Sequence, residues 1–108
     1  MWNTVFGVTK EGKKAHRYIL VNNKGMSVEL SDFGALVLSI YVLDKYGRKR
    51  DVVLGYDNLM DYYEQNTGFG AYIGRNANRI AGAEVTIEDI KYLLDKNDNQ
   101  NNLHSGFN

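Results

Sequence analysis

Three polar side chains in the last third of the 108-residue sequence have the types and the spacing to bind a small molecule. Asn78 and Arg79 are adjacent, and His104 follows Arg79 by 25 residues. A guanidinium stays charged and holds two oxygens in fixed geometry, an amide offers a donor and an acceptor, and an imidazole titrates near neutrality. The surrounding residues are mostly apolar, small or amide-bearing, as in pockets for neutral polyhydroxylated ligands. We therefore expect these three residues to bind such a ligand.

The segments that carry these residues resemble the aldose 1-epimerase (galactose mutarotase) family. Residues 74–80 read Gly-Arg-Asn-Ala-Asn-Arg-Ile, and residues 101–106 read Asn-Asn-Leu-His-Ser-Gly. The family has Gly-Arg-x-Ala-Asn-Arg-Ile, then a hairpin, then Asn-x-Leu-His-Gly-Gly, with the same separation between the arginine and the histidine. Residues 51–57 (Asp-Val-Val-Leu-Gly-Tyr-Asp) and 33–35 (Phe-Gly-Ala) resemble two further family segments in the same order. The resemblance covers nearly the whole chain but only the N-terminal third of the longer family members.

The resemblance implies that the reaction is the interconversion of α and β anomers of free aldohexoses such as galactose or glucose. This reaction takes a proton from the C1 hydroxyl and gives one to the ring oxygen, so the ring opens and recloses on its other face. It needs no cofactor and no metal. In the family, the residues matching Asn78, Arg79 and His104 line the sugar pocket, and we interpret Arg75 and Asn76 as support for that segment.

The family's main acid and base, a second histidine and a glutamate, lie downstream of the matched part and correspond to no position here. His104 is therefore predicted to be an auxiliary acid/base or a hydrogen-bond partner of the substrate, in a chain that carries half of a sugar site. Ser105 stands where the family prefers glycine. If this position requires a positive φ, serine would be strained there and could displace His104.

Two other functions fit the same residues. The first is a non-catalytic carbohydrate-binding β-module that uses Arg79 and His104 for recognition only. The second is an enzyme for a phosphorylated hexose, which would need more basic residues near His104 than Arg75 and Arg79 supply. The spacing of Gly68, Gly70 and Gly74 could suggest a phosphate-binding loop, but turns and close backbone packing explain it better. We interpret His16, which has no cluster of partner residues nearby in the sequence, as a solvated strand-end histidine rather than a functional one.

Composition limits the partners and the location. Thirteen basic and thirteen acidic residues give a formal net charge of zero, so no electrostatic force favours nucleic acid or an acidic membrane surface. The sequence has no cysteine, which excludes disulfides and thiolate metal sites and fits a reducing compartment. Its apolar runs are too short for a signal peptide or a membrane span. We expect a soluble cytoplasmic protein that binds a neutral small molecule.

The elements that must position these residues are mostly strands, as eight tyrosines and abundant Val and Ile suggest. Alternating patterns and turn residues predict strands over residues 4–9, 17–21, 26–30, 84–87 and 90–94. The apolar run 36–43 predicts a strand buried on both faces, and 49–54 predicts its returning partner. Asp57 or Asn58 can cap one short helix over residues 59–64, and 96–102 is predicted to be a loop.

These elements predict an all-β fold with antiparallel sheets and at most one short helix. The resemblance specifies an antiparallel β-sandwich of the galactose mutarotase type, with residues 1–108 as the N-terminal portion of a single domain. Such a portion exposes sheet edges and half of a core. We therefore expect self-association, or a completing chain, through the open edges.

Overall fold

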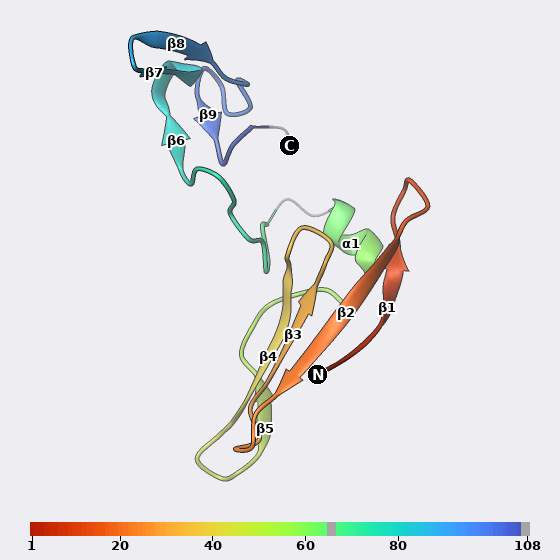
Figure 1. The fold of residues 1–108 in the computed structure, drawn as a ribbon. Helices are drawn as coiled ribbons and strands as arrows, with labels where there is room; N and C mark the ends of the chain where they lie inside the picture. The colour runs from red at the N-terminus through yellow and green to blue at the C-terminus, as the bar shows by residue number, and fades with distance from the viewer. Residues whose placement is uncertain (65–66, 107–108) are drawn as a thin grey trace. The chain divides into compact units, whose positions relative to one another are not determined.

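The computed structural model of the chain describes residues 1–64 and 67–106. The chain divides into two compact units, Met1–Tyr72 and Ile73–Asn108 (Figure 1). Both units consist mainly of antiparallel strands, and the described part of the chain has one α-helix. The predicted all-β class with one short helix is confirmed. No helix in the described ranges is long and apolar enough to cross a membrane.

The first unit contains a five-stranded sheet in which each strand pairs antiparallel with the next along the chain. Its strands are β1 (Trp2–Val8), β2 (Lys14–Val21), β3 (Ser27–Ser31), β4 (Val37–Leu43) and β5 (Lys49–Asp51). Short turns join them because residues tolerant of positive φ stand between the strands, as at Gly25 and Gly47. The strands β1 and β5 form the two edges of the sheet.

Helix α1 (Leu59–Glu64) begins at the predicted cap. The Asn58 side-chain oxygen accepts a hydrogen bond from the Asp61 N–H at 3.0 Å, and its amide donates to the Asp61 carboxylate at 2.6 Å. The first of these bonds satisfies a backbone donor that the first turn of a helix leaves unpaired. The choice between Asp57 and Asn58 is therefore settled for Asn58.

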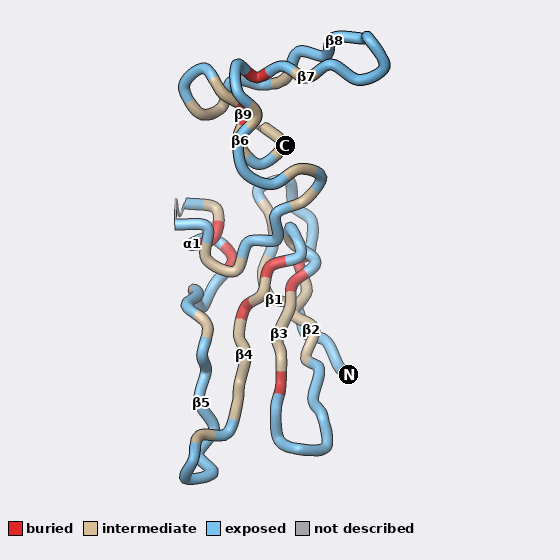
Figure 2. Tube along the Cα trace, turned by 90° about the vertical axis from the view of Figure 1, so that its left-hand side faces the viewer, coloured by how far each residue is buried: buried red, intermediate tan, exposed pale blue. Residues whose placement is uncertain are grey.

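The core of the first unit lies where α1 meets one end of the sheet. Leu36, Leu38 and Tyr62 are buried there, and Phe6, Phe33 and Tyr56 pack against them. Figure 2 shows most of the buried positions at this end of the unit. Full burial of one large apolar side chain is worth about 1.5–3 kcal/mol, so this small cluster is the main apolar contribution to the unit.

Two strand predictions are wrong in the first unit. The strand β4 is not buried on both faces, because apart from Leu38 its residues are only half-buried and Leu43 is 49% exposed. The predicted strand 49–54 ends at Asp51. The Asp51 carboxylate itself accepts the Ile40 N–H at 3.0 Å and the Val53 N–H at 3.1 Å, so a side chain takes a position that the backbone ladder would otherwise continue.

Gly70 shows why small residues are needed after the helix. It has a φ of 66°, and its carbonyl accepts a hydrogen bond from the Val37 N–H at 2.8 Å. A Cβ at this position would overlap the Val37 carbonyl. At Gly70 the interpretation as close backbone packing is confirmed.

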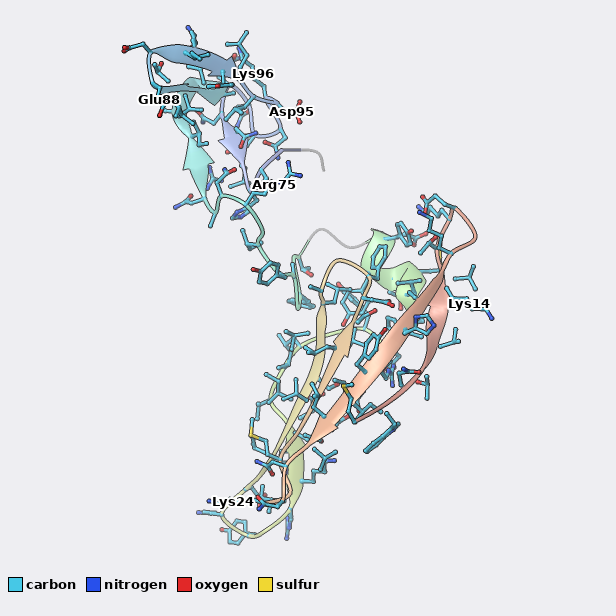
Figure 3. The ribbon with its side chains drawn as sticks, in the orientation of Figure 1. Lys14, Lys24, Arg75, Glu88, Asp95 and Lys96 are labelled. Carbon is cyan, nitrogen blue, oxygen red and sulfur yellow. The ribbon has the colours of Figure 1, made fainter. Side chains whose placement is uncertain are left out.

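The second unit contains two short antiparallel pairs and one 3₁₀ turn. Strand β6 (Arg79–Ile80) pairs with β9 (Asn102–Leu103), so the predicted loop 96–102 ends one residue earlier, and η1 (Ala81–Ala83) follows β6. Strands β7 (Glu84–Ile87) and β8 (Ile90–Leu93) form the predicted hairpin. Their turn residues Glu88 and Asp89, the first labelled in Figure 3, have φ values of 48° and 63°. Both central residues are thus left-handed, as a type I′ turn requires, although neither is glycine.

Little of the second unit is buried. Ala83 and Asn102 are 1% exposed, and the Asn102 amide donates to the Asp95 carbonyl at 2.9 Å. In contrast, the large apolar side chains of the β7–β8 hairpin are exposed, Leu93 by 78% and Ile87 by 57%. This unit is therefore held together mainly by hydrogen bonds between loops and strands.

Candidate functional site

The β6–β9 pair brings the two predicted site segments together. Arg79 pairs with Leu103 and Ile80 with Asn102, so Asn78 and His104 come to lie opposite each other just beyond the ladder. The His104 N–H donates to the Asn78 carbonyl at 3.0 Å. The Asn78 N–H in turn donates to Nδ1 of the His104 ring at 3.0 Å. Two residues separated by 26 positions are thus joined by a reciprocal pair of hydrogen bonds.

This contact fixes which ring nitrogen of His104 carries the proton. Nδ1 accepts the Asn78 N–H, so in the neutral ring the hydrogen is on Nε2. His104 is exposed, and its Nε2–H can therefore donate to a ligand oxygen. The backbone contact at Nδ1 thus orients the ring and leaves Nε2 as the nitrogen that can act on a ligand.

Arg79 is held by an acid from the loop that precedes β9. Its Nε donates to Asp98 Oδ2 at 2.6 Å, with the Arg79 side chain 53% and the Asp98 side chain 25% exposed. Asp98 is fixed by a backbone bridge to Asn101, with N–H to O distances of 3.1 and 2.9 Å. The ion pair uses Nε, so the two terminal nitrogens of the guanidinium are not engaged in it.

The Asn97 side chain supports the turn that bears His104. Its Oδ1 accepts the Leu103 N–H at 2.7 Å, and its Nδ2 donates to the Leu103 carbonyl at 2.7 Å and to the Gly106 carbonyl at 3.2 Å. One amide thus satisfies both backbone groups of Leu103, as a neighbouring strand would. Three loop bonds therefore converge on the residues on either side of His104.

Ser105 connects the same turn to the segment before Asn78. Its hydroxyl accepts the Asn76 N–H at 3.2 Å and lies 2.9 Å from the Gly74 carbonyl and 3.3 Å from the Asn76 carbonyl, to which it can donate. Its φ is 74°, so the condition under which serine would be strained at this position is met. This conformation costs a non-glycine residue about 1–2 kcal/mol.

A family model described as aldose 1-epimerase matches residues 16–108. This chain belongs to the aldose 1-epimerase family. The galactose mutarotase of Rattus norvegicus is 36% identical to it over 104 residues, which are 96% of this chain and 30% of that protein. The aldose 1-epimerase of Escherichia coli (strain K12) is 35% identical over 106 residues, 98% of this chain and 31% of that protein. The chain thus spans about 30% of the length of these relatives.

Solved structures show the same fold. A crystal structure of an aldose epimerase homologue from C. elegans matches with a TM-score of 0.80 at 29% identity, covering 87% of this chain and 29% of that chain. A galactose 1-epimerase from Lactobacillus acidophilus matches with a TM-score of 0.77 at 23% identity, covering 96% and 30%, and supports the fold alone. The predicted galactose mutarotase type of fold is confirmed.

In this aldose 1-epimerase family member, Asn78, Arg79 and His104 lie in one unit, Arg79 on the β6–β9 pair and the other two just beyond its end. Arg75, labelled in Figure 3, is exposed and has a φ of 46°, whereas Asn76 is half-buried and is bound by Ser105. Sequence reasoning missed Asn97 and Asp98. The signal that could have found them is their place shortly before the Leu103-His104 motif, in a run otherwise assigned to a loop.

His16 differs from the solvated strand-end histidine that we predicted. It lies in β2, half-buried, with Nδ1 2.8 Å from Asp32 Oδ2 and its own N–H donating to Asp32 Oδ1 at 2.7 Å. The hydrogen bond from the His16 N–H is the main cause that lowers the pKa of the Asp32 carboxyl. The prediction failed because Asp32, 16 residues away, reaches His16 only through the pairing of β2 with β3. Across residues 1–64 and 67–106, no group of three or more His, Cys, Asp or Glu side chains is arranged to hold a metal ion.

Proposed function

We propose that this chain forms the sugar-binding part of an aldose 1-epimerase, which interconverts the α and β anomers of free aldohexoses such as galactose or glucose. The observation that carries the proposal is the reciprocal pairing of Asn78 with His104, which leaves the His104 Nε2–H as a donor. His104 directly follows Leu103, the residue that pairs with Arg79. A rigid set of donors is what a pyranose ring with several hydroxyl groups requires. Membership of the family supplies the class of substrate.

Each of the three residues has a separate role in this proposal. His104 donates from Nε2 to a sugar oxygen and so stabilises negative charge that develops there as the ring opens. Arg79 holds two sugar oxygens with its terminal nitrogens while Asp98 fixes Nε. The Asn78 side chain contributes a donor and an acceptor to a neighbouring hydroxyl. Because Nδ1 of His104 is already an acceptor within the protein, His104 assists and does not serve as the main base.

The main acid and base are, in this proposal, supplied by polypeptide beyond these 108 residues. Residues 1–108 then form the N-terminal portion of one sandwich domain, and the sheet edges β1 and β5 are the surfaces at which a completing chain or a second copy pairs. Exposed apolar residues on β1, such as Val5 at 54%, support this. Light scattering on the purified chain tests it, with dimers or larger species expected and a stable monomer at high concentration as the contrary result. A cytoplasmic location and the absence of nucleic-acid and membrane partners stay predictions.

A non-catalytic carbohydrate-binding module is the second candidate function. It is favoured by the fact that the fixed groups of the site, the Nε2–H of His104 and the guanidinium of Arg79, are hydrogen-bond donors. Such groups recognise a sugar without transferring a proton. This alternative gives saturable binding of hexose with no acceleration of anomer exchange, even when further polypeptide completes the fold.

The deciding experiment combines binding with catalysis. Galactose is titrated into the labelled chain, and we expect NMR shifts at His104 and Asn78 but none at His16, which lies in the other unit. The same sample is added to freshly dissolved α-galactose in a polarimeter. We expect no acceleration by the chain alone and acceleration after addition of the part of a relative that this chain does not match, lost again in Arg79→Ala. Shifts without acceleration in either sample favour the binding module, and no shifts at His104 or Asn78 contradict both functions.

A further inference from the structure

The hydroxyl of Ser105 acts both as an acceptor and as a donor toward one other segment of the chain. Oγ accepts the Asn76 N–H at 3.2 Å, and its hydrogen can go to the Gly74 carbonyl at 2.9 Å or to the Asn76 carbonyl at 3.3 Å. A hydroxyl has one hydrogen and two lone pairs, so it can satisfy an N–H and a carbonyl at once. These contacts join residues that are 29 and 31 positions apart.

The backbone at Ser105 is suited to glycine rather than serine. His104, Ser105 and Gly106 have φ values of 52°, 74° and 101°, so three successive residues are left-handed. Glycine would adopt this conformation without strain, whereas serine is strained. Gly74, Asn76 and Ser105 are all half-buried, so a glycine at position 105 would leave the Asn76 N–H without the partner it has here. The hydroxyl therefore provides a hydrogen-bond acceptor for the Asn76 N–H that glycine could not provide.

The bonds of Ser105 lie next to those of His104, on the same pair of segments. Residues 74–76 lead directly into Asn78, whose N–H holds His104 Nδ1 and whose carbonyl accepts the His104 N–H. His104 and Ser105, which are consecutive in the turn, thus form hydrogen bonds to two places on the segment that leads into β6. If the Ser105 contact is lost, residues 74–76 lose their hydrogen bonds to the turn, and the Asn78 pair alone remains to keep the residues just before β6 against His104.

We propose that Ser105 is a positioning residue, whose hydroxyl latches residues 74–76 onto the His104 turn and thereby holds the His104 ring with Nε2–H available to the ligand. The consequence for hexose binding rests on the function proposed above. The latch itself does not, because it is a property of the free protein. The latch predicts that removal of the Ser105 hydroxyl changes the tautomer of His104.

The test uses ¹⁵N NMR on the full 108-residue chain and two variants that separate the hydroxyl from the strain. Ser105→Ala removes the hydroxyl and keeps the strain, and Ser105→Gly removes both. In each we expect the Asn76 amide to exchange with solvent roughly tenfold faster, because its bond opens locally. We also expect the His104 ring nitrogens to move from the shifts of a fixed Nε2–H tautomer towards those of a mixture.

Two controls accompany this test. The chain has two histidines, and His16, in the first unit, must keep its ring shifts. Asn99→Gly relieves a positive φ of 56° in the adjacent loop without touching the latch, and it must leave the Asn76 and His104 signals unchanged. If Ser105→Ala fails to fold, Ser105→Gly still gives the result, because it relaxes the backbone.

The outcomes are distinct. Unchanged Asn76 exchange and unchanged His104 ring shifts in a folded Ser105→Gly variant overturn the latch. Galactose titrations then address its role in the site: we expect binding to weaken roughly fivefold in both variants, the equivalent of about one neutral hydrogen bond. Shifted His104 signals with unaltered galactose binding overturn the positioning role. If the His104 signals change in the variants but those of the wild-type chain do not respond to galactose, the sugar site is refuted and the latch stands.

Discussion

Asp98 Oδ2 lies 2.6 Å from Nε of Arg79, so an acid from a loop orients the cation of the candidate sugar site. The pair is 19 residues apart and is joined because β6 and β9 close the intervening hairpin and loop. More than half of the Arg79 side chain is exposed. The value of such a pair lies in orienting the guanidinium, since exposed ion pairs contribute only about 0–1 kcal/mol to stability.

Substitution of Asp98→Asn should therefore affect binding more than folding. We expect the free energy of unfolding to fall by less than about 1 kcal/mol and galactose binding to weaken by a larger factor, because Nε loses its charged partner. Urea denaturation and NMR titration measure the two quantities. Glu84→Gln, which breaks the exposed Lys91 pair at 2.6 Å in the same unit, is the matched control and should leave binding unchanged. Equal binding by Asp98→Asn and the wild type would exclude the orienting role.

Replacement of Arg79 by lysine tests the guanidinium itself. Lysine keeps the charge but cannot present two parallel donors, so we expect hexose binding to weaken by about 1–3 kcal/mol, the worth of a charged hydrogen bond. NMR titration of galactose into Arg79→Lys measures this difference. Lys96→Arg, a charge-preserving change on an exposed neighbouring loop residue, is the control. A dissociation constant within twofold of the wild-type value would remove Arg79 from the site.

The turn between β7 and β8 offers a stabilising substitution. Asp89 has a φ of 63° in a two-residue turn, a position that glycine occupies without strain. Asp89→Gly should therefore stabilise the second unit by about 1 kcal/mol, seen as slower amide exchange across the hairpin. Gly47→Ala, which imposes the opposite change on a turn with a φ of 76° in the first unit, should be destabilising. Exchange that is unchanged or faster in Asp89→Gly would show that the aspartate side chain contributes more than its strain costs.

The strands and turns could largely be predicted because their signals are local. The hairpin turns after Val21 and Ile87 and the cap at Asn58 depend on residues adjacent in sequence, and the structure confirms them. The burial of β4 could not be predicted, because an apolar run shows that a strand can be covered and not which layer covers it. The early end of β5 could not be predicted for a related reason. It depends on the Asp51 side chain, which accepts a hydrogen bond from Ile40 on the neighbouring strand.

The candidate site could be predicted only where a motif indicated its residues. The motif predicted Asn78, Arg79 and His104, whereas the contacts of Asn97 and Asp98 follow from the β6–β9 register, which no local pattern encodes. Ser105 lies between these cases. The glycine preference of the family pointed to a possible positive φ there, but the φ itself and the bonds to Gly74 and Asn76 needed the structure.

The hydrogen bonds between His16 and Asp32 make the free energy of unfolding of the first unit depend on pH. The His16 N–H, bonded to Oδ1, is the main cause that lowers the pKa of Asp32, with smaller contributions from the His16 ring and the Tyr18 hydroxyl. A lowered pKa in the folded state means that the stabilisation is fully present above the ordinary aspartate pKa of about 3.9 and is lost as the pH falls through the lowered value. Wild type should thus exceed Asp32→Asn in stability at pH 7, and the difference should shrink below about pH 4.

Urea denaturation followed by the fluorescence of Trp2 measures this difference, because the only tryptophan of the chain lies in β1 of the first unit. Asp57→Asn, an aspartate change in the same unit but outside this network, controls for the loss of one negative charge. A difference between wild type and Asp32→Asn that is the same at pH 7 and pH 3 would show that the Asp32 charge does not stabilise β2 against the segment after β3. The expected convergence at low pH would assign His16 a structural role, as the backbone donor that holds Asp32.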